Sequence, residues 1–174
     1  MSSADSAANR ASSLGLNGGS IIYYDMEHYT NYEPGCDTNV SAAVNSFLSG
    51  WVVELAHDGY STGVYESASN LLSVASDGNP PSYVWIGGGG FSAGSYGCHG
   101  NVWGNAYVPD GYWTFDQRLY QYTAGHSENW GGVAIGIDSD AAIGNATPRS
   151  YDDSGEPDEG GNEVNSPTYD VPPC

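Results

Sequence analysis

The sequence predicts an α/β protein with a largely parallel sheet. Segments with helical periodicity alternate with short apolar runs, and glycines or prolines separate most of these segments. This alternation is typical of βαβ crossovers, in which neighbouring strands run parallel. The chain has 174 residues, of which 39% are hydrophobic and 13% aromatic, enough for one domain with a substantial core.

The first three predicted elements are a helix, a strand and a second helix. Alanines and a leucine follow helical spacing in residues 4–16, and glycines stop this helix. The apolar run at 21–27 predicts a strand. Residues 40–58 predict an amphipathic helix, because apolar side chains recur at i, i+3, i+4 and i+7. Thr38 or Asn39 is the expected cap of that helix.

A short strand, a short helix and a third strand come next. The strand is centred on Val64 and Tyr65, and the helix covers residues 67–75. The third strand lies in residues 82–90, which end in a run of glycines. Residues 91–116 are rich in aromatic residues and glycine but have no clear periodicity. They therefore predict a surface insertion.

Two more strands are predicted, at 118–123 and 132–140. The final segment, 147–174, is rich in Pro, Gly, Asp and Glu and nearly free of aliphatic residues. Such a composition cannot bury enough apolar surface to fold, so we expect a disordered acidic tail. The expected organisation is one domain at 1–146 followed by this tail.

The charge of the chain restricts its partners. There are 21 Asp and Glu residues against three Arg and no Lys, a formal net charge of −18. A surface of this sign repels phosphate backbones, so we expect no nucleic-acid binding. It suits a neutral or cationic substrate, or it serves solubility alone. No run of 18 apolar residues is present, and we expect no membrane span.

The sequence leaves the cellular compartment and the pairing of the cysteines open. The N-terminus lacks the basic start and apolar core of a signal peptide, whereas the Tyr-, Gly- and Asn-rich composition without Lys resembles that of a secreted protein. Cys36 and Cys98 could pair, but free thiols are about equally favoured. The four histidines show no ligand spacing, and the glycine run at 87–90 lacks the features of a phosphate loop. We therefore expect no metal site and no cofactor.

Two carboxylates at the end of the first strand are the leading candidates for chemistry. Asp25 and Glu27 are two residues apart, so on a strand both side chains point to the same face, with Cα atoms about 6.5–7 Å apart. The carboxyl ends of parallel strands are where active sites lie in α/β sheets and barrels. Glycoside hydrolysis needs two carboxyl groups in different protonation states. A single D-x-E tripeptide is nevertheless a weak signal in an acidic chain.

Other predicted strands also end on residues that suit a sugar-binding cleft. These are Tyr65, Trp85, Gln121, Tyr122 and Asp138. Aromatic faces, amides and carboxylates are the groups that bind sugar rings. Packing within the sheet explains each of the three aromatic residues about equally well when it is taken singly, and Asp138 could equally lie in a turn.

The strand-end motifs together resemble a known family. The segments are SIIYYDMEHY, FLSGWVVELAHDGYSTGVYES, YVWIGG, RLYQYT and GGVAIGIDSD. In this order they resemble the glycoside-hydrolase-like family catalogued as domain-of-unknown-function family 1906, a relative of the family 25 lysozymes. The resemblance covers roughly residues 3–141 and is much more specific than the D-x-E motif alone.

The resemblance implies a TIM-type (β/α) barrel with its cleft at the carboxyl ends of the strands. The chain matches the fourth to eighth of eight strands, so we expect an incomplete barrel, either because the chain is a fragment of a longer protein or because the sheet stays open. By the same resemblance, Glu27 is the acid/base residue and Asp25 its support. Asp138 matches the strand-eight aspartate and Tyr65 a strand tyrosine, while Gln121 and Tyr122 lie near the cleft.

The implied function is hydrolysis of peptidoglycan or a related cell-wall glycan by a secreted enzyme. A glycan would then be the partner, and the oligomeric state stays open. The alternative is a glycan-binding or cell-wall-associated module that keeps the aromatic cleft but has lost turnover. The two hypotheses differ in whether Glu27 is needed for clearing of a cell-wall substrate.

Overall fold

The computed structural model describes residues 2–27, 40–88 and 102–143. The predicted helix caps Thr38 and Asn39, all three cysteines and the tail at 147–174 lie outside the described residues. The helices are α1 (Ser3–Ser13), α2 (Val40–His57) and α3 (Ala68–Ala75). The strands are β1 (Ile21–Met26), β2 (Ser61–Ser67), β3 (Tyr83–Gly87), β4 (Arg118–Trp130) and β5 (Val133–Ala142).

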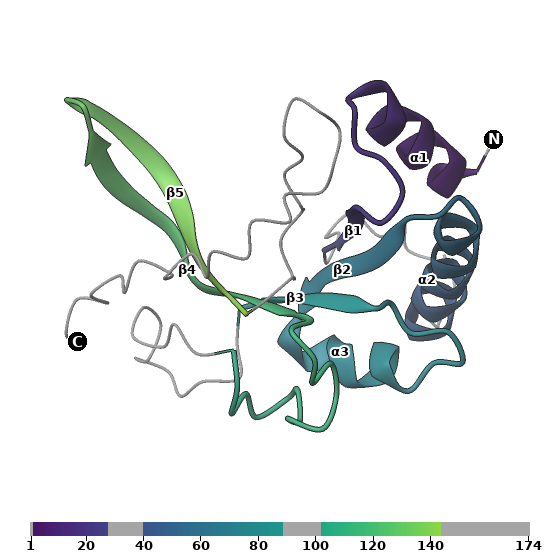
Figure 1. The fold of residues 1–174 in the computed structure, drawn as a ribbon. Helices are drawn as coiled ribbons and strands as arrows, with labels where there is room; N and C mark the ends of the chain where they lie inside the picture. Colours follow the sequence, from purple (N-terminus) through teal and green to yellow (C-terminus); the bar gives the residue numbers. More distant parts are fainter. Residues whose placement is uncertain (1, 28–39, 89–101, 144–174) are drawn as a thin grey trace.

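The predicted order of elements is confirmed, and the strands form one curled half-barrel sheet. Their order in the sheet is β1-β2-β3-β4-β5, the same as in the chain (Figure 1). The first four strands run parallel to their neighbours. This is expected where α2 connects β1 to β2 and α3 connects β2 to β3. Helices α2 and α3 pack on one side of this sheet in Figure 1.

The last pair of strands departs from the parallel arrangement of the others, which leaves the sheet largely parallel, as predicted. Strand β5 runs antiparallel to β4, and β4 continues to Trp130 instead of ending near residue 123. Only Gly131 and Gly132 separate the two strands, and both have positive φ, at 58° and 84°. A two-residue loop of this conformation makes a hairpin, whereas a parallel connection needs about a dozen residues or more.

The outer part of the hairpin projects from the rest of the sheet as a two-stranded ribbon (Figure 1). Within the ribbon, His126 Nε2 lies 2.9 Å from Glu128 Oε1. Trp130 Nε1 donates a hydrogen bond to the other carboxylate oxygen of Glu128, at 2.7 Å. These contacts join successive side chains on one face of β4 and fix their orientation.

The main core lies between the sheet and the helices α2 and α3. Alternate residues of the strands, such as Val64, Val84 and Ile86, are fully buried and pack with Leu48 of α2 and Leu71 of α3. Because side chains alternate along a strand, the intervening residues face away from the helices. The helix-covered face is therefore the apolar face, and the other face is free to form a site.

A second cluster attaches α1 to the domain. Ala4, Ala8 and Ala11 of α1 pack with Trp51 and Leu55 of α2. The small alanine side chains allow the two helices to approach closely. No helix in the described part of the chain combines the length and apolar character that a membrane crossing requires.

The segment before β4 is only partly a surface insertion. In its described part, residues 102–116, Val102 and Val108 are buried in the main core, while Phe115 is 85% exposed. The buried guanidinium of Arg118 anchors the segment by donating hydrogen bonds to backbone carbonyl oxygens of Val102, Pro109 and Tyr112. The irregular sequence therefore covers one end of the core, which the lack of periodicity did not reveal.

Candidate functional site

A cleft of about 630 Å³ opens on the face of the sheet that the helices do not cover. Residues from all five strands or their ends line it: Tyr23, Asp25, Glu27, Tyr65, Trp85, Gln121, Ala124, Asp138 and Asp140. Asp25, Glu27 and Tyr65 lie at or near the carboxyl ends of β1 and β2, whereas Tyr23 and Trp85 lie in the middle of their strands. The antiparallel β5 contributes because its register places Asp140 directly opposite Gln121 of β4.

The structure brings together six of the seven residues singled out from the sequence. Asp25, Glu27, Tyr65, Trp85, Gln121 and Asp138 all line the cleft. Tyr122 does not, because it follows Gln121 on β4 and packs against the main core. Tyr122 is adjacent to Gln121 in the chain, but its side chain faces the opposite side of the strand, and its expected role near the cleft stays a prediction.

Three aromatic rings form a packed group along the cleft. Trp85 makes edge-on contacts with Tyr65 and Tyr23, with ring centroids 5.3 Å and 6.0 Å away. The rings of Tyr23 and Tyr65 lie over Gly63 and Gly87, where a β-carbon would overlap them. Glycine at these two positions lets the rings lie against the sheet instead of standing away from it.

A chain of hydrogen bonds connects β2, β4 and β5 across the cleft. The hydroxyl of Tyr65 donates to Gln121 Oε1 at 2.8 Å, and Gln121 Nε2 donates to Asp138 Oδ2 at 3.0 Å. The other oxygen of Asp138 accepts from the backbone N–H of Gly125 at 2.7 Å. Gln121 can both accept and donate, so it orients the tyrosine and the aspartate together.

Asp140 is held separately by the indole of Trp85. Trp85 Nε1 donates to Asp140 Oδ1 at 2.6 Å, a charge-assisted hydrogen bond. Burial raises the pKa of Asp140, the hydrogen bond from Trp85 lowers it, and the charge of Asp138 raises it further, with a net increase. The cleft therefore holds one carboxyl group whose neutral form is favoured by its surroundings.

The negative field of the cleft also acts on Tyr65. Burial raises the pKa of its hydroxyl, and the charges of Glu27, Asp25, Asp138 and Asp140 raise it further. All four carboxylates of the cleft thus act on the same tyrosine. Tyr65 stays protonated and keeps its role as hydrogen-bond donor to Gln121.

Asp25 and Glu27 differ from the two aspartates of β5. All four carboxylates are exposed, but Asp25 and Glu27 accept no hydrogen bond from any residue in the described ranges. Within that part of the chain no protein donor occupies these two carboxylates, whereas Asp138 and Asp140 accept hydrogen bonds from neighbouring groups. This combination can supply mobile carboxylates for proton transfer beside oriented carboxylates and aromatic rings that position a substrate.

Sequence reasoning missed three lining residues, Tyr23, Ala124 and Asp140. Period-two alternation could have found two of them. Tyr23 lies two residues before Asp25, and Asp140 two residues after Asp138, so each pair shares a face of its strand. Ala124 follows a shift in the pairing of β4 with β5, which cannot be read from the pattern.

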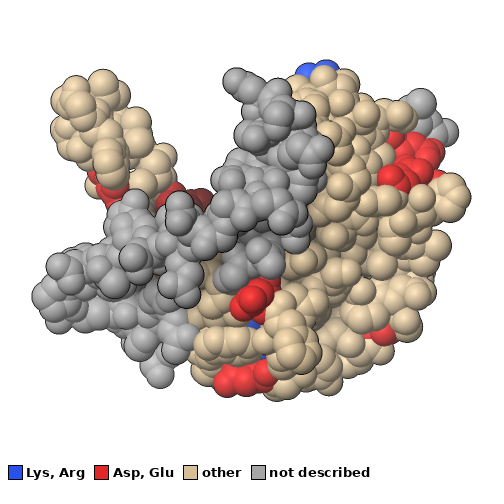
Figure 2. Space-filling model, in the orientation of Figure 1, with Lys and Arg blue, Asp and Glu red and all other residues tan. Residues whose placement is uncertain are grey.

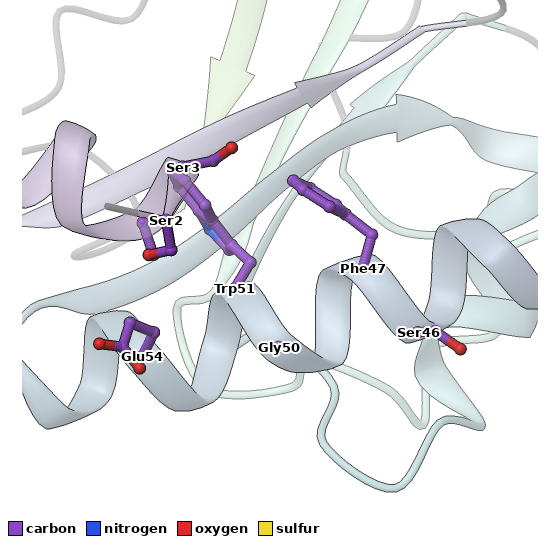
Figure 3. A pocket seen from close by; sticks show the side chains of 8 residues that line it. Ser2, Ser3, Ser46, Phe47, Gly50, Trp51 and Glu54 are labelled. Carbon is purple, nitrogen blue, oxygen red and sulfur yellow. The ribbon is translucent and has the colours of Figure 1, made fainter.

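A smaller concavity of about 320 Å³ lies between α2 and the start of α1 (Figure 3). Figure 3 shows Phe47 and Trp51 projecting from α2, with Ser2 and Ser3 beside Trp51. Glu54 is its only ionisable described side chain. It lacks the grouped carboxylates of the larger cleft.

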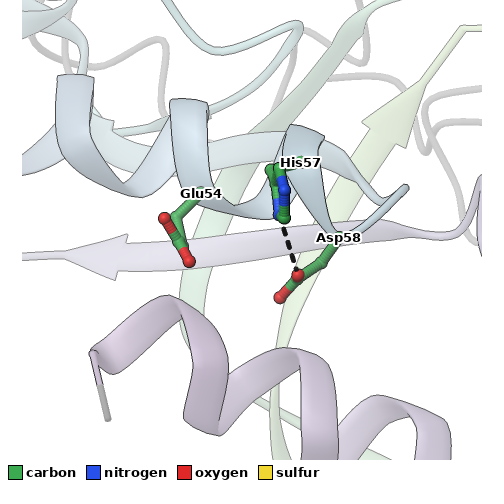
Figure 4. A group of neighbouring side chains, drawn as sticks. All are labelled: Glu54, His57 and Asp58. Atoms are coloured by element: carbon green, nitrogen blue, oxygen red, sulfur yellow. Dashed lines mark ion pairs between the residues drawn. The ribbon is translucent and has the colours of Figure 1, made fainter.

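Glu54 also belongs to a surface group with His57 and Asp58 at the end of α2 (Figure 4). One potential ligand atom from each side chain lies within 4.8 Å of the others, and His57 Nδ1 lies 3.5 Å from Asp58 Oδ1. Helical neighbours three and four residues apart meet in this way without an ion.

Comparison with known proteins links the chain to one family. A family model described as "Rv2525c-like, glycoside hydrolase-like domain" matches residues 1–142, which include every strand and every described lining residue of the cleft. The searches of curated proteins and of solved structures found no match.

Proposed function

The chain belongs to the Rv2525c-like glycoside hydrolase-like domain family, and we propose that its cleft binds a cell-wall glycan and hydrolyses it by carboxylate acid/base catalysis. The observation that carries this proposal is the meeting of Asp25, Glu27, Asp138 and Asp140 with three aromatic side chains in one cleft. Aromatic faces bind the apolar faces of sugar rings, and paired carboxyl groups catalyse cleavage of the glycosidic bond.

In this proposal Glu27 is the general acid. It donates a proton to the glycosidic oxygen as the bond to the leaving sugar breaks, while Asp25 stays ionised and stabilises the positive charge on the sugar ring. A water molecule then forms the new bond to the anomeric carbon, and its proton passes to a carboxylate of the cleft. The free position of both side chains in the cleft supports these roles, because they can reach a bound substrate. Asp138, Gln121, Tyr65 and Trp85 position the sugar.

The same proposal includes an assignment of the strands within a barrel and a class of substrate. The five strands correspond to the fourth to eighth strands of a TIM-type barrel, with the final pair rearranged into a hairpin. Peptidoglycan or a related wall polysaccharide is the proposed substrate class, and action outside the cell follows from such a substrate. The supporting facts are the family membership and the acidic, aromatic cleft.

A specific observation favours a second candidate, a module that binds glycan without cleaving it. General-acid carboxyl groups of glycosidases are usually buried, because burial keeps them protonated near neutral pH. Asp25 and Glu27 are both exposed. A binding module would use the same aromatic rings and the oriented aspartates but would not require proton transfer by Glu27.

The discriminating experiment is a cell-wall zymogram of the full chain and its Glu27→Gln variant. We expect clearing by the wild type and a loss of about 100-fold or more in the variant, because general acid catalysis contributes at least that much. Glu54→Gln is the matched control, since it removes the same charge on α2 outside the cleft, and it should clear normally. Glycan binding without clearing by the wild type would establish the binding module instead.

A further inference from the structure

The described lining of the cleft carries one sign of charge. Asp25, Glu27, Asp138 and Asp140 contribute four carboxylates, and the nine lining residues include no arginine, lysine or histidine. A cleft lined by one sign of charge concentrates the field within it. The raised pKa of Tyr65 is a local sign of that field, because all four carboxylates contribute to it.

The rest of the chain offers few cations to offset these charges. It contains three arginines and no lysine. Arg10 lies in α1, and Arg118 is buried beneath the opposite face of the sheet, where its hydrogen bonds go to backbone carbonyl oxygens. Arg149 lies outside the described residues. Figure 2 accordingly shows several acidic patches and very little basic surface in the view drawn.

The hydrogen-bonding groups of the cleft also favour a ligand that is rich in donors, such as a cation. Tyr65, Gln121 and Trp85 each donate to a protein acceptor in the lining. The oxygens of Asp25 and Glu27 accept no hydrogen bond from the described residues. Among the described residues, the cleft therefore offers acceptors that no protein donor occupies, and a ligand that brings donors fits it better than one that brings acceptors.

The aromatic group strengthens this bias toward a cation. The ring of Trp85 packs edge-on against the rings of Tyr23 and Tyr65. These contacts hold the three rings in one group. Electron-rich ring faces attract ammonium groups, and the attraction is strongest for tryptophan. A protonated amine in this cleft would lie near both aromatic rings and carboxylates.

We propose that the cleft selects glycans whose hexosamine units carry a free, protonated amino group, over N-acetylated or carboxylate-bearing glycans. This inference rests on the proposed glycan-binding function and names the substrate class of the same site. The ammonium group supplies three donors and a positive charge to the free carboxylates. An acetamido group brings a carbonyl acceptor instead, and a uronate adds a fifth negative charge.

The test compares binding of three size-matched oligosaccharides to the full chain by isothermal titration calorimetry. The probes are hexamers of glucosamine, N-acetylglucosamine and galacturonic acid, at about pH 6, where ordinary carboxyl groups are ionised and an amine is largely protonated. At about 20 mM salt we expect the glucosamine hexamer to bind about tenfold tighter than the N-acetylated one, and the uronate most weakly. The preference should shrink several-fold at about 300 mM salt.

Two charge-neutralising variants separate the cleft from the general acidity of the protein. Glu27→Gln should weaken binding of the glucosamine hexamer several-fold more than binding of the N-acetylated hexamer. Glu54→Gln removes one charge outside the cleft and should change neither. An equal loss in both variants would overturn the proposal, because it would show attraction by the whole surface.

The outcomes also separate this inference from the function on which it rests. Tighter binding of the N-acetylated or uronate hexamer at low salt would overturn the amine preference and leave glycan binding established. If none of the three hexamers binds, glycan binding by this cleft fails and the preference fails with it.

Discussion

At the scale of single residues, Asp140 connects the aromatic group to the carboxylates of the cleft. Its carboxylate accepts from Trp85, whose ring contacts Tyr65 and Tyr23. The same residue is charged in surroundings that favour its neutral form, because burial and the charge of Asp138 raise its pKa. Sites that bind or react often retain such unfavourable charges, at a cost in stability.

Because of this cost, we expect Asp140→Asn to change the stability of the fold in a pH-dependent way. A carboxyl group whose pKa is raised in the folded state binds more protons folded than unfolded. Its contribution to stability is therefore complete below the unfolded value near 3.8 and declines as pH rises through the folded value. We expect Asp140→Asn to be more stable than the wild type at pH 7, by about 0.5 kcal/mol or less because the group is partly exposed.

The measurement is the difference in thermal midpoint between wild type and Asp140→Asn at several pH values. The difference should be positive at pH 7 and disappear near pH 3, where the wild-type carboxyl is itself protonated. Asn can still accept the hydrogen bond from Trp85, so the geometry is preserved. A variant less stable than the wild type at pH 7 would show that the charge of Asp140 stabilises the fold.

At the scale of elements, the segment before β4 depends on Arg118. Its guanidinium is fully buried, donates to carbonyl oxygens of Val102, Pro109 and Tyr112, and stacks on the ring of Trp103 at 4.3 Å. The pKa of Arg118 is lowered by burial, which the nearby charge of Asp110 partly offsets. The side chain thus substitutes for the backbone ladder that this irregular segment lacks.

Arg118→Met should consequently be strongly destabilising. Methionine fills similar space but leaves the carbonyl oxygens of Val102, Pro109 and Tyr112 without these donors, and we expect a loss of about 3 kcal/mol or more in the free energy of unfolding. Chemical denaturation followed by circular dichroism measures it. Arg10→Met is the matched control on α1 and should cost about 0.5 kcal/mol or less. Equal effects of the two substitutions would contradict the anchoring role of Arg118.

The elements themselves were largely predictable from the sequence, with one instructive exception. Amphipathic spacing identified α2, and short apolar runs identified all five strands. The extension of β4 was missed because residues 124–130 mix polar residues with glycine and give no alternating pattern. Gly131 and Gly132 were the available signal, since two glycines between apolar runs are typical of a hairpin turn.

At the scale of the whole molecule, the composition of the cleft was more predictable than its geometry. Strand-end positions on parallel strands meet at one edge of a sheet, so Asp25, Tyr65 and Trp85 could be expected together. Which residue of an adjacent pair faces the cleft depends on the register of the strands. That register separated Gln121 from Tyr122, and it brought in Asp140 through an antiparallel pairing that no local pattern specifies.

The net charge of the molecule leads to a final prediction, about salt. Residues 1–146 carry 14 Asp and Glu against two Arg, a formal charge of −12, so the predicted domain concentrates mutually repelling carboxylates in a small volume. The screening length falls from about 30 Å at 0.01 M salt to about 8 Å at 0.15 M, so most of this repulsion should be screened in that interval. We expect the thermal midpoint at pH 7 to rise by several degrees between these concentrations and to change less beyond them.

Repeating the titration near the isoelectric point gives the matched control. At about pH 4.1 the net charge approaches zero, so salt has little net repulsion left to screen. Stabilisation by charge screening should then be much weaker than at pH 7, whereas stabilisation by a general solvent effect of the salt should persist. A rise of equal size at both pH values would contradict the electrostatic origin. A fall at pH 7 would mean that favourable ion pairs outweigh the repulsion among the carboxylates.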